Sequence, residues 1–222
     1  MFASSSVHLS NGRTMEDAVC NHANAVDRSR ISDLFYEFHD EVGKLTSKVC
    51  EQEGISKEDI ERATSLNTEL ARTEAQFYHE TYNNRELQGR KEEIMNKKVA
   101  EKGSSPSEID TLKKIYKRVS EIKSKSMAEL QPKWAVISDY YGYIDGEGYL
   151  MGCGHSVDYY RKRGGYSAVT REVFAELTEQ RFNDEANYQF TKSKMPDVVE
   201  AYEELYNKIK SGVIKSLKER RG

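Results

Sequence analysis

The sequence has few prolines and cysteines and no long apolar run. Three prolines and three cysteines occur in 222 residues. Cys20, Cys50 and Cys153 form no CxxC pair, so neither a disulfide framework nor a cysteine-built zinc knuckle is indicated. No apolar run approaches the roughly 20 residues of a membrane span, and the first residues lack the pattern of a signal peptide. We therefore expect a cytoplasmic chain with reduced thiols and no membrane span.

The sequence also lacks an excess of one charge. Charged residues make up 32% of the chain, yet the net charge is only −3 because both signs are interspersed. This composition gives no electrostatic footprint for nucleic acid and no broad patch of one sign directed at a membrane. Hydrophobic residues make up 37%, which is enough for one large or two small domains. We expect a globular protein.

Hydrophobic periodicity divides the chain into three zones. Residues 1–30 contain a predicted helix that starts after Thr14, a plausible N-cap. Residues 31–130 carry apolar side chains three and four residues apart in a charged background, which predicts amphipathic helices. Ser56 is the predicted cap of one of these helices. Residues 131–222 combine tyrosines with glycines, and the sequence from Gly142 to Gly154 predicts a short hairpin or an ordered loop before two closing helices.

Two glutamates on one of the closing helices are the first candidates for chemistry. Glu172 and Glu176 lie four residues apart on a helix with apolar neighbours, so they share one face. They can form a solvated edge, or they can be a metal ligand and a partner carboxylate. His155 follows a glycine-rich turn that could hold an imidazole at a cleft. His22 has no second ligand at the i+4 spacing that a helical zinc pair needs.

The last part of the chain carries a recognisable order of motifs. The sequence contains GGYSAVTREVFAEL, and MPDVVEAYEELYNKI follows it. The matched positions are Ser138, Asp139, Gly154, His155, Tyr159, Tyr160, Glu172 to Glu176, Pro196 and Tyr202. This order resembles the end of the anthrax lethal factor type of zinc metallopeptidase domain. Similar domains occur at the C-terminus of phage minor head proteins and of secreted bacterial toxins.

The resemblance implies roles for individual residues. In the catalytic members of the family, the position of Glu172 is the third zinc ligand and a tyrosine placed like Tyr166 stabilises the oxyanion. Glu176 would then orient a ligand or lie at the edge of the core. The only stretch that aligns with an HExxH motif is AVCNHANAVD, residues 18–27.

The alignment with HExxH fails at its reactive positions. Cys20, Asn21 and Asn24 stand where the first histidine, the glutamate base and the second histidine are expected. An asparagine amide is a poor zinc ligand and cannot deprotonate water. The resemblance therefore implies a pseudo-metallopeptidase that holds no cofactor. Zinc enters only in the alternative, a hydrolase with unorthodox ligands such as His22 or His155 with Glu172.

These observations together predict an α+β, mainly α, lethal-factor-like domain with a helical insertion. Residues 1–30 would hold the degenerate helix, residues 31–130 the insertion and residues 131–222 the C-terminal half. The expected function is binding to a protein of a phage head or of a host, as a head-associated or ejected protein. The alternatives are a metal-dependent hydrolase or toxin-type peptidase, and a toxin-derived bacterial adaptor. The chain would be made in the cytoplasm and then join a virion or enter a host cell.

Overall fold

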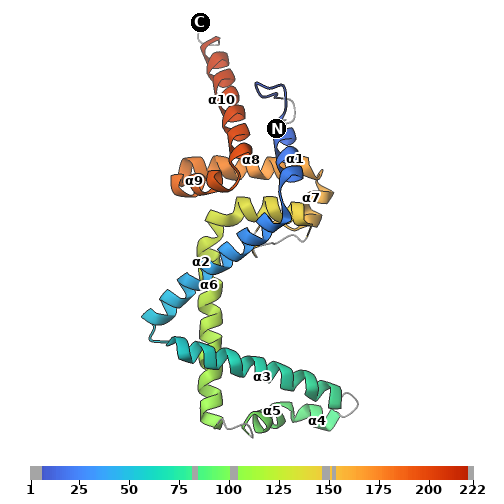
Figure 1. The fold of residues 1–222 in the computed structure, drawn as a ribbon, viewed down its shortest axis with the longest axis vertical. Helices are drawn as coiled ribbons and strands as arrows, with labels where there is room; N and C mark the ends of the chain where they lie inside the picture. The colour runs from blue at the N-terminus through green and yellow to red at the C-terminus, as the bar shows by residue number, and fades with distance from the viewer. Residues whose placement is uncertain (1–6, 82–84, 101–104, 147–150, 152–153, 220–222) are drawn as a thin grey trace. The chain divides into compact units, whose positions relative to one another are not determined.

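The chain is helical throughout the part that its computed structural model describes, which is residues 7–81, 85–100, 105–146, 151 and 154–219 (Figure 1). The helices over these residues are α1 (Met15–Ala25), α2 (Arg28–Gln52), α3 (Lys57–Thr81), α4 (Arg85–Gly89), α5 (Lys91–Ala100), α6 (Pro106–Asp145), α7 (Val157–Lys162), α8 (Tyr166–Asn183), α9 (Glu185–Lys194) and α10 (Pro196–Glu219).

The predicted α+β class is wrong, because the described residues contain no strand. The aromatic stretch before Gly146 continues α6. Its buried side chains recur three and four residues apart, at Trp134, Ile137 and Tyr141, which is the period of a helix. The rest of the expected hairpin, residues 147–150 and 152–153, lies outside the described residues.

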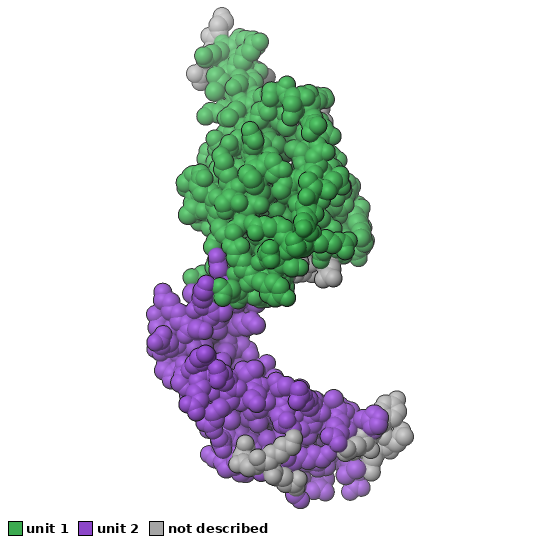
Figure 2. Space-filling model, in the orientation of Figure 1, with its two compact units in different colours: residues 1–40, 128–222 green, residues 41–127 purple. Residues whose placement is uncertain are grey.

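The chain forms two compact units (Figure 2). Unit 1 consists of residues 1–40 and 128–222, and unit 2 consists of residues 41–127. The change in composition along the sequence predicts boundaries at about residues 30 and 131. Pro132 lies inside α6, and its carbonyl accepts a hydrogen bond from Gln180 at 3.1 Å.

Two helix starts follow the predicted capping chemistry. Thr14 caps α1, because its hydroxyl accepts from the Asp17 backbone N–H at 3.1 Å and the Asp17 carboxylate accepts from the Thr14 N–H at 2.7 Å. Ser56 caps α3 in a related way and accepts from the Asp59 N–H at 3.0 Å. Both predicted caps are confirmed.

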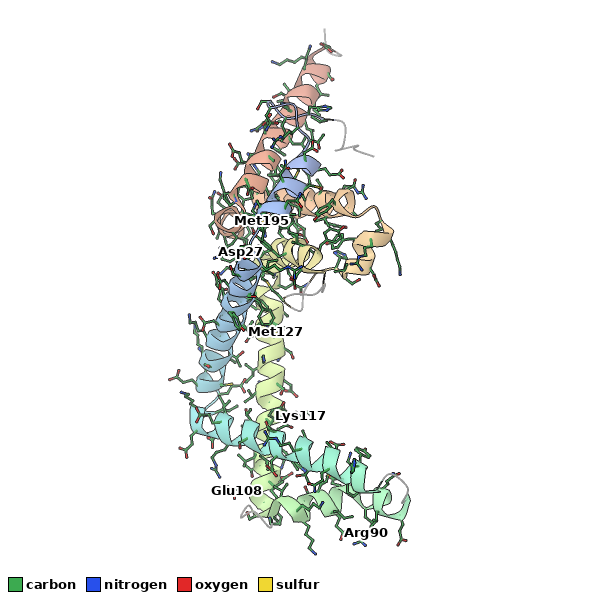
Figure 3. The ribbon with its side chains drawn as sticks, turned by 45° about the vertical axis from the view of Figure 1, so that its right-hand side comes forward. Asp27, Arg90, Glu108, Lys117, Met127 and Met195 are labelled. Atoms are coloured by element: carbon green, nitrogen blue, oxygen red, sulfur yellow. The ribbon has the colours of Figure 1, made fainter. Side chains whose placement is uncertain are left out.

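The core of unit 1 is built from large aromatic side chains. Trp134, Tyr140 and Tyr141 of α6 are fully buried, as are Tyr160 of α7 and Tyr202 of α10. Helix α1 packs against α8 and α10, and α8 packs against α7, α9 and α10. The short turn between α9 and α10 is fixed by the fully buried side chain of Met195 (Figure 3).

Unit 2 has a smaller, aliphatic core. Ala63 and Leu66 of α3 pack with Val99 of α5 and with Ile109 and Leu112 of α6. Figure 1 shows α5 running beside α3, in agreement with the packing of these two helices. None of the described helices in either unit is long and apolar enough to cross a membrane.

Candidate functional site

The strongest polar cluster of unit 1 is centred on Asp139, a residue of α6 that is only 1% exposed. One of its carboxylate oxygens accepts a hydrogen bond from the backbone N–H of His155, and the other lies 3.0 Å from His155 Nδ1. A carboxylate only accepts hydrogen bonds, so Nδ1 carries the proton and Nε2 is the acceptor of the neutral ring. The His155 side chain is 40% exposed. Asp139 thus fixes both the position and the tautomer of a solvent-accessible imidazole.

Gly154 permits this contact. Its φ of 91° lies in the left-handed region, and a Cβ at this position would lie 1.7 Å from Asp139 Oδ1. Glycine is the one residue that both fits the backbone conformation and leaves room for the carboxylate. The Gly-His pair of the sequence is therefore explained by the close approach of the backbone to Asp139.

Two tyrosines connect His155 to the carboxylates of α8. The His155 ring stacks on Tyr159 with centroids 4.0 Å apart. The Tyr159 hydroxyl donates to Glu172 at 2.7 Å and accepts from Arg163 at 2.9 Å. Burial, followed by a hydrogen bond to Asp139, raises the pKa of Tyr160 far above its usual range. We call Asp139, His155, Tyr159, Tyr160, Arg163, Glu172 and Glu176 the Asp139 cluster.

Glu176 is the carboxyl of this cluster with the most unusual environment. Its Oε2 is buried and has no hydrogen-bond partner among the described residues. Burial, with the nearby charges of Asp139 and Glu172, raises the pKa of Glu176 to about 8. Glu176 is therefore a neutral acid at pH 7. The motif match singled out Glu172, whereas Glu176, one turn later, is the residue with a buried carboxyl oxygen that lacks a partner among the described residues.

The helix expected to replace HExxH lies elsewhere in unit 1. Asn21 and Asn24 are exposed on α1, whereas Cys20 is half-buried. Burial, together with Glu16 and Asp17, raises the pKa of the Cys20 thiol. Within the described part of the chain, no hydrogen bond or ion pair joins Cys20, Asn21 or Asn24 to Glu172.

Cys20 instead lies near Tyr166, the residue that the resemblance assigns to oxyanion stabilisation. Burial is the main cause that raises the pKa of Tyr166, and the nearby Cys20 and Tyr143 add to it. The Tyr166 ring packs edge-on against Tyr143 with centroids 5.1 Å apart. Tyr166 and Glu172 therefore face different neighbours, although both belong to α8.

His22 belongs to a third group of side chains. Its Nδ1 lies 2.7 Å from Asp197 Oδ2 at the start of α10, and its Nε2 lies 3.1 Å from the Tyr141 hydroxyl. Both ring nitrogens thus have partners within the protein. Tyr141 also donates towards the Lys194 carbonyl at 3.3 Å. The geometry gives His22 a role in joining α1 to α6 and α10.

The zinc alternative was tested against the donors that the structure positions. Nowhere in the described residues do three or more His, Cys, Asp or Glu side chains gather so that they could hold a metal ion. Glu172 is engaged by Tyr159, and His155 is held by Asp139. These donors do not fit a zinc site as they stand, and we derive no chemical step through zinc.

Unit 2 contains a groove between α3 and α5, which we call the α3–α5 groove. Its volume is about 610 Å³. An apolar floor and a polar rim line it, with Leu66, Leu70 and Met95 among the apolar residues and Asn67, Lys91 and Lys113 among the polar ones. A cavity of about 400 Å³ shares Glu92, Asn96 and Lys113 with it and extends it towards the start of α6.

The rim of the α3–α5 groove is fixed by side chains that bridge helices. Lys91 of α5 donates to Glu74 and, at 3.0 Å, to the Tyr78 hydroxyl, both on α3. Lys113 of α6 donates to Asn96 of α5 at 3.0 Å. These bonds hold the polar side chains of the groove in place.

Comparison of the chain with protein-family models, with curated proteins and with solved structures gives no match. The resemblance to the lethal-factor-like domain therefore rests on the motifs in the sequence.

Sequence reasoning missed two members of these sites. The sequence did not indicate Arg163, because this residue stands in a run of basic residues that is typical of a solvated turn. Asp197 was overlooked because it follows Pro196, where an acidic residue is expected simply as part of a helix start. Asp139 is one of the matched motif positions, but the sequence indicated no role for it. The glycine before His155 was the available signal that its backbone approaches another group closely.

Proposed function

We propose that the chain acts by binding another protein, and that the α3–α5 groove is the binding surface. The observation that supports the proposal is the combination of an apolar floor with a fixed polar rim. Grooves of this kind accept the apolar face of an amphipathic helix, while the polar rim sets its orientation. The groove lies in unit 2, which contains most of the predicted helical insertion.

The biological setting that we propose follows from the motif order around His155 and Glu172. In proteins with similar motifs, such a domain belongs to phage head proteins or to secreted toxins. We therefore propose a phage head-associated or ejected protein that is made in the cytoplasm and then joins a virion or enters a host cell. A toxin-derived bacterial adaptor is the alternative, and it would use the same groove for a cellular partner.

Site-specific photo-crosslinking in the producing cell tests the proposal. Ala71 is exposed and lines the groove, whereas Ala75 is exposed on the same helix but does not line it. A photo-reactive residue at position 71 should capture a discrete protein that position 75 does not capture. Ala71→Arg should block capture from a probe at Asn67, because the long side chain fills the groove. Equal capture from positions 71 and 75, or none from either, would contradict the proposal.

The identity of the captured protein separates the two settings. A component of phage particles that sediments with the chain supports the head-associated role. A cellular protein that is captured in the absence of particles supports the adaptor. Because both settings use the same surface, Ala71→Arg should abolish capture in either one.

A second candidate function, hydrolysis, is favoured by one specific observation. Asp139 holds the ring of His155 through Nδ1, which leaves Nε2 as the acceptor on a side chain that is 40% exposed, as a general base requires. The test is cleavage of unfolded casein by the purified chain. His155→Gln should abolish any cleavage, whereas His39→Gln, in α2, should not affect it.

A further inference from the structure

The last turns of α10 carry exposed aliphatic side chains. The buried part of this helix ends at Leu205. Val213, Ile214 and Leu217 are then 49%, 44% and 51% exposed. Ile209 precedes Val213 by four residues, so that Ile209, Val213 and Leu217 follow one face of the helix. We call residues 206–219 the α10 tail, and Figure 1 shows it extending beyond α8 and α9.

The α10 tail is strongly basic, unlike the chain as a whole. It contains Lys208, Lys210, Lys215 and Lys218 against one acidic residue, Glu219, and Arg220 and Arg221 follow in the sequence. By helical spacing, Lys208, Lys215 and Lys218 lie away from the aliphatic face. The tail is thus an amphipathic helix whose polar face is cationic, attached to a chain with a net charge of −3.

We propose that the α10 tail binds the surface of bilayers that contain anionic lipids. A helix with an aliphatic face and a lysine-rich polar face lies in the plane of the interface, with its apolar side chains below the head groups. Each lysine near such a surface adds a favourable electrostatic contribution. The exposed Val213, Ile214 and Leu217 would be covered by acyl chains, and Lys210, Lys215 and Lys218 would face the phosphates. Lys208 pairs with Glu204 and donates to the His8 carbonyl within the protein.

The pattern of the α10 tail favours a bilayer over the other candidate partners. Nucleic acid would engage the lysines but would leave Val213 and Leu217 exposed to water. A second copy of the tail would cover the aliphatic face but would leave Lys208, Lys215 and Lys218 on the outer side without an anionic partner in the other copy. An acidic groove in a protein would cover the aliphatic face and pair with Lys210 at its edge, but it would leave Lys208 and Lys215 on the far side. A broad anionic surface attracts all of these lysines, because charges within a Debye length contribute.

Co-sedimentation of the full chain with vesicles tests this proposal directly. Vesicles of equal parts phosphatidylcholine and phosphatidylserine should bind the protein, and vesicles of pure phosphatidylcholine should bind it far more weakly. Raising NaCl from about 0.1 M to about 1 M should release most of it, because the Debye length falls from about 10 Å to about 3 Å. The double variant Val213→Ser and Leu217→Ser should bind at least about tenfold more weakly than the parent.

Matched variants separate the tail from general electrostatics. Lys215→Gln with Lys218→Gln should weaken binding by about thirtyfold, since each lysine contributes about fivefold. Lys57→Gln with Lys114→Gln makes the same charge change at exposed positions of unit 2 and should have a much smaller effect. The serine variant should keep the unfolding transition of the parent, because the replaced side chains are exposed.

Three results would overturn the proposal. The first is no binding to phosphatidylserine vesicles at about 0.1 M NaCl. The second is equal loss of binding in the two lysine pairs. The third is a serine variant that binds like the parent while duplex DNA competes fully with the vesicles, because the tail would then act as a nucleic-acid contact. The α3–α5 groove is unaffected by these variants, so neither proposal depends on the other.

Discussion

Asp139 and His155 are joined by two hydrogen bonds to the same carboxylate, one from the backbone N–H and one from Nδ1. The two residues lie sixteen positions apart, on α6 and directly before α7. The contact therefore ties the entry of α7 to the buried end of α6. It also explains why an acidic side chain can be 1% exposed, because both oxygens are satisfied.

Replacing Asp139 should destabilise the protein markedly. Asp139→Asn turns one oxygen into an amide that cannot accept a hydrogen bond from His155, so either the backbone N–H or Nδ1 of His155 loses its partner and the buried side chain at position 139 loses a bond. We expect a loss of about 2–4 kcal/mol in the free energy of unfolding, measured by urea denaturation. The control is Asp158→Asn at an exposed position of α7, which should change stability by less than about 0.5 kcal/mol. Equal effects of the two changes would contradict the role of the buried carboxylate.

Gly154 should be much more sensitive to substitution than a glycine with a similar backbone. Gly154→Ala combines a φ of 91° with a Cβ 1.7 Å from Asp139 Oδ1. Gly146→Ala has a comparable φ of 79° and no atom within 4 Å of the new Cβ. We expect a cost of about 1–2 kcal/mol at Gly146 and clearly more at Gly154, because the second change also displaces Asp139. Thermal unfolding of both variants checks this order. Equal losses of stability at the two positions would show that only the backbone conformation matters and that the contact with Asp139 does not.

The sequence predicted helices well where the pattern was local. The caps at Thr14 and Ser56 depend on neighbouring residues, as do the closing helices predicted from about Ser167 and Pro196. The structure has both caps, and it begins these two helices at Tyr166 and Pro196. The α+β class failed because glycines and tyrosines before Gly146 were read as turn chemistry. Their spacing also fits a helix, and burial of Tyr140 and Tyr141 in a tertiary core favours that choice.

The candidate site was predicted only in part, because its geometry depends on contacts distant in sequence. The motif order pointed to His155 and Glu172, which do belong to one cluster through Tyr159. No local pattern could show that Asp139 would face His155, or that Oε2 of Glu176 would be buried without a partner among the described residues. The environment of Glu176 depends on tertiary packing around α8, which the spacing along α8 does not encode.

Glu172 should stabilise the fold through Tyr159 and independently of zinc. Its carboxylate accepts from the Tyr159 hydroxyl at 2.7 Å. Glu172→Ala and Tyr159→Phe should each cost about 1 kcal/mol, and the double variant should cost little more than either, because they remove the same bond. Melting temperatures with added zinc and with chelator should be identical for the parent and for Glu172→Gln. Stoichiometric zinc in the purified protein, with a melting temperature that chelator lowers, would revive the metallopeptidase alternative.

The pH dependence of stability should report the buried Glu176. Its pKa of about 8 in the folded state lies above the ordinary value of 4.5, so between these pH values the folded state binds the proton that the unfolded state releases. Stability from this group is complete below pH 4.5, is lost as the pH rises through about 8, and then levels off. The slope reaches about 1.4 kcal/mol per pH unit.

Glu176→Gln imitates the protonated acid, so the variant should match the parent in stability near pH 5 and exceed it by a few kcal/mol at pH 9. Urea denaturation at both pH values measures this difference. Glu200→Gln, at an exposed position of α10, is the control and should follow the parent at each pH. If the Glu176→Gln variant and the parent lose the same stability between pH 5 and pH 9, the Glu176 carboxyl of the parent is already ionised at neutral pH.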